Sequence, residues 1–345
     1  MSAEPAGRVV HAAGGMWRGG KKLPPPGSAA EIEQALAADE DSQAWMFLPR
    51  SDAAALRPAS GRLGLDELAV EDLVNPREGI KAEWVNRTLV AVLPVASYDP
   101  TAAELDLRTV ALVADGRLMI VLADSDLRPR LAKALSAAPL TTLGIPAAVH
   151  AVLDVSVNSC AASLRELTES VEALSEKIFQ DRPFTRAEQL QAYRLRRALG
   201  RLRRTSNPLS DVCSDLANAA GRRAGQEPDP DDPAETLLGV RSSREFSDVA
   251  DHAKHVAELG LALREEVASM YETNLSLADV RLNTVMKKLA GWGAIIAVPT
   301  LITGFLGMNV DYPGFGTVTG FVVAAVVLLA IPAALFLVFR RKDWL

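Results

Sequence analysis

A stripe of small and weakly polar side chains lies in the apolar region near the C-terminal end of the chain. Spacings of three and four residues place its members on one face of a predicted helix. They are Asn283, Met286, Ala290, Gly293, Ala297, Thr300 and Gly304, with Asn309 at the far end. Small residues at this spacing allow helices to pack closely in lipid, and carbonyl and hydroxyl oxygens there would equally suit a narrow ion pore. The spacing alone favours neither interpretation.

A second group with potential chemistry lies within about two turns of a predicted helix. Its members are Asp248, Asp251, His252 and His255. Carboxylates and imidazoles at this spacing can bind a softer divalent metal such as Zn²⁺ or Co²⁺, although a solvated helix face is the favoured interpretation. The two cysteines, Cys160 and Cys213, have neither a metal nor a redox spacing, so we assign them no function.

Six arginines gather on another predicted helix, where phosphate groups could bind. They are Arg194, Arg196, Arg197, Arg201, Arg203 and Arg204. Aromatic residues typical of nucleic-acid recognition do not alternate with them, and the net charge of the whole chain is −6. A solvated or ion-paired helical face is therefore the favoured interpretation, and no nucleic-acid partner is expected.

The elements that carry the stripe are two predicted membrane helices. Residues 289–308 and 317–339 are each long and apolar enough to cross a bilayer, which takes about 20 residues. The intervening segment 309–316 is too polar and turn-rich to remain in lipid, so it is expected to be an extracellular loop. Basic residues flank the pair, with a basic tail at 340–345, and are absent from the loop. This pattern predicts a multi-pass protein of the inner or plasma membrane with both termini in the cytoplasm.

The preceding part of the chain, almost 290 of its 345 residues, is long enough for a core of its own. We expect a flexible N-terminus at 1–30, a cytosolic α/β domain at 31–146, a cytosolic helical region at 147–233 and a stalk helix at 234–288. Apolar runs predict β-strands at 44–48, 87–95, 107–114 and 117–122. If the stalk continues into the first membrane helix, one helix would extend from residue 234 to residue 308.

The segment Gly307-Met308-Asn309 ends the first predicted membrane helix and is followed by a short loop, one more apolar helix and the basic tail. In this position it resembles the signature of the CorA family of divalent-cation channels. The preceding segments 283–289 and 299–306 strengthen the resemblance, and residues 70–83 are similar to a second pattern of that family in its soluble part. The resemblance therefore extends over most of the chain.

The resemblance implies a homopentamer with a funnel-shaped cytosolic part, in which the long helix of each protomer lines one central pore. Asn309 would form a ring at the extracellular entrance, with Gly307 and Met308 holding its loop. The pore would be lined further inward by Thr300, Ala297, Leu289, Met286 and Asn283. Asp311, the sole acid of the loop, would either concentrate cations at the mouth or serve as a turn residue.

The resemblance also implies a regulatory metal site between neighbouring subunits. Its counterparts here are Asp72 and Asp248, with Glu71 and Asp251 close by. Bound Mg²⁺ would neutralise the clustered carboxylates and hold the pore closed, and loss of the cation would let them repel one another.

The function implied is a channel that admits Mg²⁺, and also Co²⁺ or Ni²⁺, under control of cytosolic Mg²⁺. Departures from the family's pattern leave the ion open, because Leu306 replaces the usual aromatic residue, Pro299 lies one position late, and the loop reads Tyr312-Pro313-Gly314-Phe315. A Zn²⁺ transporter of the same architecture is one alternative, and a membrane-anchored oligomeric sensor or scaffold is another. Neither a phosphate-binding glycine loop nor a nucleophile motif is present, so no enzyme activity is expected.

Overall fold

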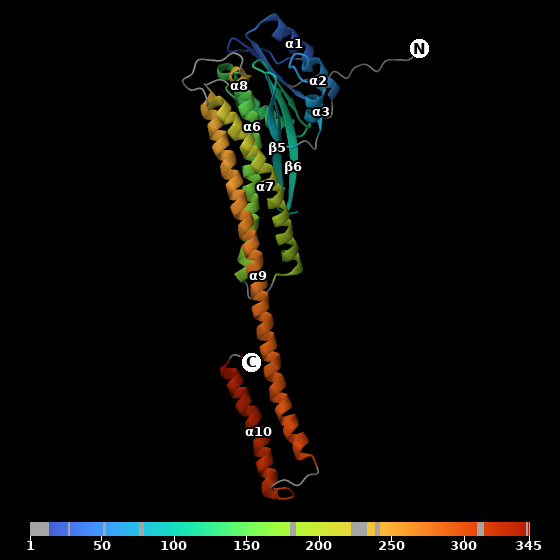
Figure 1. Ribbon diagram of the computed structural model, residues 1–345, viewed down its shortest axis with the longest axis vertical. Helices are drawn as coiled ribbons and strands as arrows, with labels where there is room; N and C mark the ends of the chain where they lie inside the picture. Colours follow the sequence, from blue (N-terminus) through green and yellow to red (C-terminus); the bar gives the residue numbers. More distant parts are fainter. Residues whose placement is uncertain are drawn as a thin grey trace, which may run out of the picture. The chain divides into compact units, whose positions relative to one another are not determined.

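The computed structural model describes residues 14–26, 28–50, 53–75, 79–179, 184–221, 233–238, 242–308, 314–342 and 344. The contacts divide the chain into two units. The first comprises Met1–Lys177 and Thr185–Ala268, and the second comprises Ile178–Phe184 and Ser269–Leu345. Figure 1 colours the elements by their position in the sequence.

Within the described part of the first unit, seven strands form one mixed sheet. They are β1 (Gly14–Arg18), β2 (Lys21–Lys22), β3 (Ser42–Leu48), β4 (Lys81–Val85), β5 (Thr88–Asp99), β6 (Glu104–Ala114) and β7 (Leu118–Leu122). Their order is β2-β1-β3-β7-β6-β5-β4. β3 and β7 run parallel, and the other neighbouring strands are antiparallel. The four predicted runs correspond to β3, β5, β6 and β7, and the predicted α/β class is confirmed.

Helices cover both faces of the sheet (Figure 1). The helices on one face are α1 (Ala29–Ala38), α2 (Ala53–Ser60) and α3 (Glu67–Val74). There Leu36 and Leu73 join every second strand residue, such as Met46 and Ile120, in one apolar cluster. Alternation along the strands directs the intervening side chains to the other face. That face is covered by α6 (Ile145–Ser175), which follows α4 (Arg128–Ala137) and α5 (Leu140–Leu143).

Two serines attach α6 to β5. Ser156 donates its hydroxyl hydrogen to the carbonyl oxygen of Pro94, and Ser159 Oγ accepts a hydrogen bond from the backbone N–H of Ala96 at 2.9 Å. Both serines are buried, so these bonds also satisfy their own polar groups. α6 is followed by the 3₁₀ helix η1 (Glu176–Phe179) and by α7 (Arg186–Gly221), which lies beside α6.

One prediction about the N-terminal residues was wrong. We expected residues 1–30 to be flexible because they are rich in glycine and proline, but β1 and β2 lie within this range. β1 pairs with the free edge of β3, and the buried Trp17 donates its Nε1–H to Gln43 Oε1 at 2.8 Å. The glycines serve this pairing, since a Cβ added at Gly14 would lie 2.6 Å from the carbonyl oxygen of Trp45.

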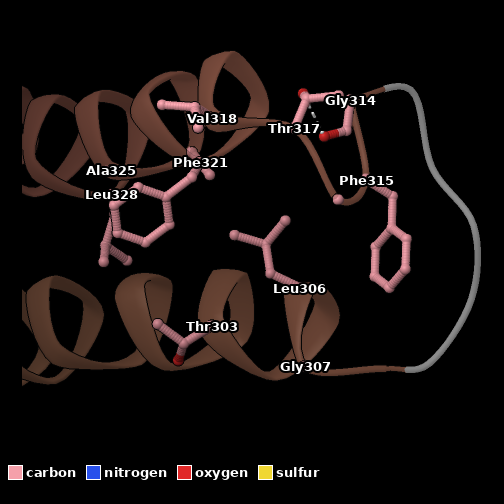
Figure 2. Close-up of a pocket in the computed structure, with 12 residues that line it drawn as sticks. Thr303, Leu306, Gly307, Gly314, Phe315, Thr317, Val318, Phe321, Ala325 and Leu328 are labelled. Atoms are coloured by element: carbon pink, nitrogen blue, oxygen red, sulfur yellow. Dashed lines mark hydrogen bonds between the residues drawn. The ribbon is translucent and has the colours of Figure 1, made fainter.

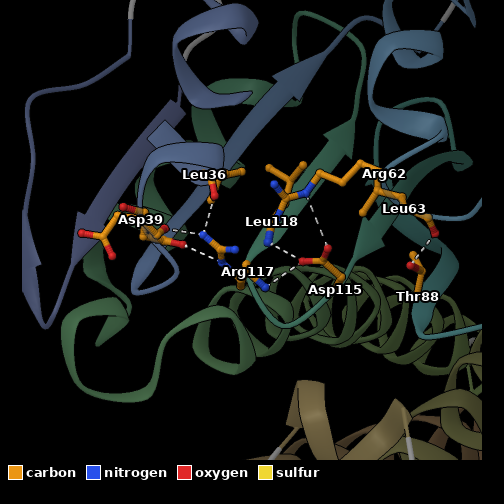
Figure 3. Close-up of polar contacts among 9 residues, drawn as sticks. Leu36, Asp39, Arg62, Leu63, Thr88, Asp115, Arg117 and Leu118 are labelled. Atoms are coloured by element: carbon orange, nitrogen blue, oxygen red, sulfur yellow. Dashed lines mark hydrogen bonds and ion pairs between the residues drawn. The ribbon is translucent and has the colours of Figure 1, made fainter. Parts of the chain in front are cut away.

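A polar network joins the loop before β7 to α1 (Figure 3). The guanidinium group of Arg117 donates to the carbonyl oxygens of Leu36, at 2.7 Å, and of Asp39. Asp115 Oδ1 accepts the backbone N–H groups of Arg117 and Leu118, each at 2.7 Å, which shapes the turn between β6 and β7. These bonds hold the turn that leads into β7, which is the parallel partner of β3.

The long C-terminal helix begins later than predicted. We expected one helix from residue 234, whereas the structure has the short helix α8 (Pro233–Leu238) and then α9 (Ser243–Leu306). α8 buries Leu237 and Leu238, and α9 buries apolar positions from Phe246 onward, so each helix has tertiary support of its own. α9 belongs to the first unit up to Ala268 and to the second from Ser269. It is followed by α10 (Val318–Arg341).

Candidate functional site

In the second unit, one side of α9 faces α10. The rings of Trp292 and Phe336 lie 6.4 Å apart between centroids. Nearer the loop, Thr303 and Leu306 of α9 and Phe321 of α10 line an apolar cavity of about 790 Å³ (Figure 2). These contacts define the side of α9 that faces α10.

The predicted stripe lies on a different side of α9. Ala297, Thr300 and Gly304 line a separate apolar depression of about 730 Å³, together with Met308. The difference follows from the helical repeat of 3.6 residues, which separates them around the axis from Trp292, Thr303 and Leu306. The stripe is therefore not used to pack α9 on α10 within one protomer.

The predicted residues nearer the start of the apolar segment are also exposed. Asn283 is exposed, and Met286 and Leu289 are 58% and 68% exposed. Large apolar side chains with this exposure are unusual on a monomeric surface unless lipid or another chain covers them. The stripe and its apolar neighbours thus form a surface that needs a non-aqueous partner.

Of the threonines at this level of α9, Thr300 belongs to the stripe and Thr303 lies on the side that faces α10. Thr300 Oγ1 donates to the carbonyl oxygen of Ile296 at 2.9 Å, and Thr303 Oγ1 lies 3.0 Å from the carbonyl oxygens of Pro299 and Thr300. A hydroxyl that donates to its own helix keeps its lone pairs for a cation or its water. Pro299 has no N–H, which removes one helical hydrogen bond at this level of α9.

The motif Gly307-Met308-Asn309 begins where α9 ends. The N–H of Gly307 donates to the carbonyl oxygen of Thr303 at 2.9 Å, and that of Met308 donates to Phe305 at 3.2 Å. The second bond spans three residues and tightens the last turn. A Cβ at position 307 would lie 3.2 Å from the Thr303 oxygen, so glycine suits this turn. Asn309 and Asp311 lie outside the residues that the structure describes.

The return of the chain into α10 is shaped by Thr317 and two glycines. Thr317 Oγ1 accepts the N–H of Gly320 at 3.1 Å and donates to the carbonyl oxygen of Gly314 at 2.8 Å, as an N-cap does. Gly314 has a φ of +98°, which favours glycine. A Cβ at Gly320 would overlap the Gly314 carbonyl oxygen. No capping role was predicted for these residues, although Thr followed by Gly at the start of an apolar run is a recognisable signal.

Of the described helices, three are long and apolar enough to cross a membrane. In the helix Ile145–Ile178, 78% of the most apolar window is buried, which identifies it as a core helix. The corresponding buried shares are 6% for α9 and 0% for α10. The two helices predicted to cross the bilayer are therefore the two whose apolar surface the protomer leaves uncovered.

The predicted regulatory acids belong to the first unit. Asp72 on α3 accepts a hydrogen bond from Lys81 Nζ at 2.8 Å, and Lys81 also lies 3.6 Å from Glu83. Lys81 lies within the segment 70–83 but had no predicted role, because β4, which carries it, has only half-buried or exposed residues and no clear apolar alternation. Glu71 is exposed on the same helix as Asp72.

The other predicted acids lie near the start of α9. Asp248, Asp251 and His255 are exposed there, and His252 is half-buried. Among the residues that the structure describes, no three His, Cys, Asp or Glu side chains are arranged to hold a metal ion within one chain.

Comparison with protein families gives one match over most of the chain. The family model described as "CorA-like Mg2+ transporter protein" matches residues 40–341. The Cobalt/magnesium transport protein CorA of Thermotoga maritima is 25% identical over 289 residues, which are 82% of this chain and 77% of that protein.

Two solved structures share the fold along nearly the whole chain. The complete structure of the CorA magnesium transporter from Methanocaldococcus jannaschii has a TM-score of 0.71 and 19% identity, covering 96% of this chain and 98% of that one. The full-length CmaX protein has a TM-score of 0.69 and 19% identity, covering 98% of this chain and all of that one. At these identities the likeness shows the fold alone.

Proposed function

Because the chain belongs to the family of CorA-like Mg2+ transporter proteins, we propose that it is a channel that admits Mg²⁺ down its electrochemical gradient. The family assignment makes it a divalent-cation transporter rather than an enzyme. Mg²⁺ is the proposed main substrate, with Co²⁺ and Ni²⁺ as further ions, in line with the cobalt and magnesium named for the relative from Thermotoga maritima.

The observation that carries the proposal is the side of α9 on which the stripe lies. Ala297, Thr300 and Gly304 are not used in the packing of α9 on α10. Two helices cannot enclose a pore, so this free side would face the axis of a closed ring of identical chains. We infer a homopentamer in the membrane, with the lipid bilayer around α10 and both termini in the cytoplasm.

The proposed ion path suits a hydrated divalent cation. Mg²⁺ releases its water reluctantly and prefers oxygen ligands in octahedral geometry. A ring of neutral Asn309 amides at the entrance would hold the hydrated ion through its water, with Gly307 and Met308 positioning the loop and Asp311 raising the local cation concentration. Further inward, Thr300 and Ala297 would line the pore.

The narrow part of the path is proposed to be apolar. Met286 and Leu289 would form a constriction that closes by excluding water, and Asn283 would lie at its cytosolic side. Cytosolic Mg²⁺ bound between Asp72 of one subunit and Asp248 of the next, with Glu71 and Asp251 nearby, would hold the closed state. Release of this ion would let the carboxylates repel one another.

The deciding experiment measures ion entry into proteoliposomes that hold the purified full chain, with an Mg²⁺-sensitive dye inside. We expect Asn309→Ala to abolish most Mg²⁺ entry, because the amides that hold the hydrated ion are removed. Asn207→Ala is the matched control, since Asn207 is exposed on α7, far along the sequence from the proposed pore. The control should conduct like the wild type.

Parallel measurements with a Zn²⁺ dye separate the alternatives. Zn²⁺ entry without Mg²⁺ entry would contradict the proposed substrate and favour a zinc transporter of the same architecture. If well-folded oligomers pass neither ion, the channel proposal fails and a membrane-anchored sensor or scaffold is favoured.

A further inference from the structure

A polar cavity of about 440 Å³ lies in the first unit, between α7 and the connection from β5 to β6. It belongs to none of the proposed transport or regulatory sites. Leu190, Tyr193, Arg194, Arg197 and Arg201 of α7 line one side, and Glu104 lies on the other. Its volume is within the range of roughly 300 to 1,000 Å³ that small-molecule sites occupy.

The cavity has an excess of positive charge. Three of the six arginines noted in the sequence line it, against the single carboxylate of Glu104. In the described part of the chain, none of these three arginines forms an ion pair within 4.0 Å. Of the two interpretations considered from the sequence, an ion-paired helical face therefore does not account for this subset, whereas a solvated face is consistent with the exposure of Arg194 and Arg197.

Backbone carbonyls hold two of the three guanidinium groups in place. Arg194 Nη1 donates to the carbonyl oxygen of Ala102 at 3.1 Å, and Arg201 Nη1 donates to that of Leu105 at 2.7 Å. Each bond uses one of the five N–H donors of a guanidinium group, and the others remain for a ligand. The hairpin end that supplies these carbonyls is itself fixed, since Asp99 Oδ1 accepts the N–H of Thr101 at 2.8 Å.

The spacing of the arginines selects the kind of anion. Arg194 and Arg201 are seven residues apart, which is roughly 10 Å along a helix. One phosphate group does not extend over that length, whereas a chain of phosphates can meet Arg194, Arg197 and Arg201 in turn. Planar guanidinium groups bind phosphate oxygens through paired, charge-assisted hydrogen bonds.

An apolar wall adjoins the arginines at one end of the cavity. Tyr193 is 62% exposed and Leu190 is 49% exposed, although both lie on a helix that otherwise buries its apolar side chains. An exposed aromatic ring beside a phosphate-binding group is suited to stack on a planar base. Glu104 adds an acceptor for an amino or hydroxyl group of the same ligand.

From these contacts we propose that the cavity between α7 and the β5–β6 connection binds a nucleoside polyphosphate, with phosphates on Arg194, Arg197 and Arg201 and the base on Tyr193. None of the lining residues belongs to the proposed ion path. Binding of the nucleotide can therefore be tested whether or not the protein conducts Mg²⁺.

The test is isothermal titration of ATP into the detergent-solubilised full chain, without Mg²⁺ and with a chelator, so that metal binding elsewhere does not contribute. Arg197→Gln should weaken ATP binding at least about tenfold, the range expected for loss of a charge-assisted bond. Arg196→Gln is the matched control, because Arg196 is the neighbouring exposed arginine and does not line the cavity. It should change ATP affinity less than about twofold, as expected for a screened charge outside the site.

Tripolyphosphate and Tyr193→Ala test the nucleoside part. ATP should bind more tightly than tripolyphosphate, and Tyr193→Ala should weaken ATP while leaving tripolyphosphate unchanged. Equal affinities for both ligands would overturn the nucleoside assignment. The whole proposal fails if wild-type protein binds neither ligand, or if the two arginine variants lose affinity equally. Binding is read directly, so failure here leaves the transport result untouched.

Discussion

Lys81 forms an ion pair with Asp72, one of the two acids proposed to bind the regulatory cation. Its ammonium group lies 2.8 Å from Asp72, and both side chains are half-buried. A cation at Asp72 must therefore compete with an internal positive charge. This competition would place the regulatory affinity in a weak range, where changes of cytosolic Mg²⁺ can be sensed.

We predict that Lys81→Gln increases the affinity of the regulatory site for Mg²⁺. Partly exposed ion pairs contribute up to about 1 kcal/mol, so the gain should be at most about fivefold. The measurement is the internal Mg²⁺ concentration that halves flux into proteoliposomes. Lys133→Gln, an exposed lysine on α4, provides the control. A higher concentration required by Lys81→Gln than by the wild type would contradict the competition.

The two cysteines give a second prediction at this scale. Burial raises the pKa of Cys160 to about 11 and that of Cys213 to about 12, above the ordinary 9.0. The thiolate is the reactive form, so neither thiol should react with an alkylating reagent at pH 8 until the protein is unfolded. Mass spectrometry of alkylated samples measures this, and alkylation of either cysteine in the native protein would contradict it.

The same shift affects stability at high pH. A thiol whose pKa is raised by folding keeps its proton in the folded state, so its contribution to stability is complete below pH 9, the unfolded value. The contribution is lost as pH rises from 9 toward 11 for Cys160 and toward 12 for Cys213. The free energy of unfolding should therefore fall over this range, and less so in a Cys160→Ala variant.

Strands with long apolar runs could be predicted from the sequence. Strands that form only because they pair with a distant segment could not. β3, β5 and β7, and β6 over its last five residues, carry nearly continuous buried residues, a local pattern that the sequence displays. β1 contains Gly14 and Gly15 and exists because the edge of β3 is open to it, which is a contact between distant segments. The side of α9 that carries the stripe was predictable from helical spacing, but the ion pair of Asp72 with Lys81 depends on how β4 returns toward α3.

Gly144 provides a test at the junction of α5 and α6. Its φ of +67° and ψ of −146° lie in a region that glycine alone adopts easily. A Cβ there would lie 2.5 Å from Gln43 Oε1, the atom that accepts the Trp17 hydrogen bond. We predict that Gly144→Ala destabilises the protein by about 1 to 3 kcal/mol, measured as a shift in the denaturant midpoint of circular dichroism.

Gly200→Ala on α7 is the control for this substitution. A Cβ at Gly200 would meet no atom within 4 Å, and alanine is favoured over glycine in a helix by about 0.5 to 1 kcal/mol. The control should be neutral or stabilising. Equal destabilisation by both substitutions would show that the backbone conformation at Gly144 is not the cause.

For the whole molecule, the uncovered apolar surface of α9 and α10 determines which surroundings the protein can occupy. Most of the apolar window in each helix is exposed, in contrast to α6. Water cannot solvate that surface at low cost, so this surface calls for a non-aqueous environment. In the proposed homopentamer, the stripe would face the axis between neighbouring copies and α10 would face the bilayer.

The proposed orientation predicts which positions a membrane-impermeant thiol reagent can reach in intact cells. Asp311→Cys should be labelled, because the loop is proposed to be extracellular, and Lys342→Cys should be labelled only after permeabilisation. The native cysteines are buried and should give no background. The opposite pattern would reverse the topology, and labelling of both positions in intact cells would exclude a hairpin that spans the bilayer.

The parallel pairing of β3 with β7 also has a consequence for synthesis of the protein. β7 emerges from the ribosome about 70 residues after β3, which takes roughly 4 to 15 s at 5 to 20 residues per second. During that interval the edge of β3 that later pairs with β7 has no partner strand. β3 contains the apolar residues Trp45, Met46 and Phe47. The nascent chain must be shielded for those seconds, so its production should depend on holdase chaperones more than that of a chain built from local hairpins.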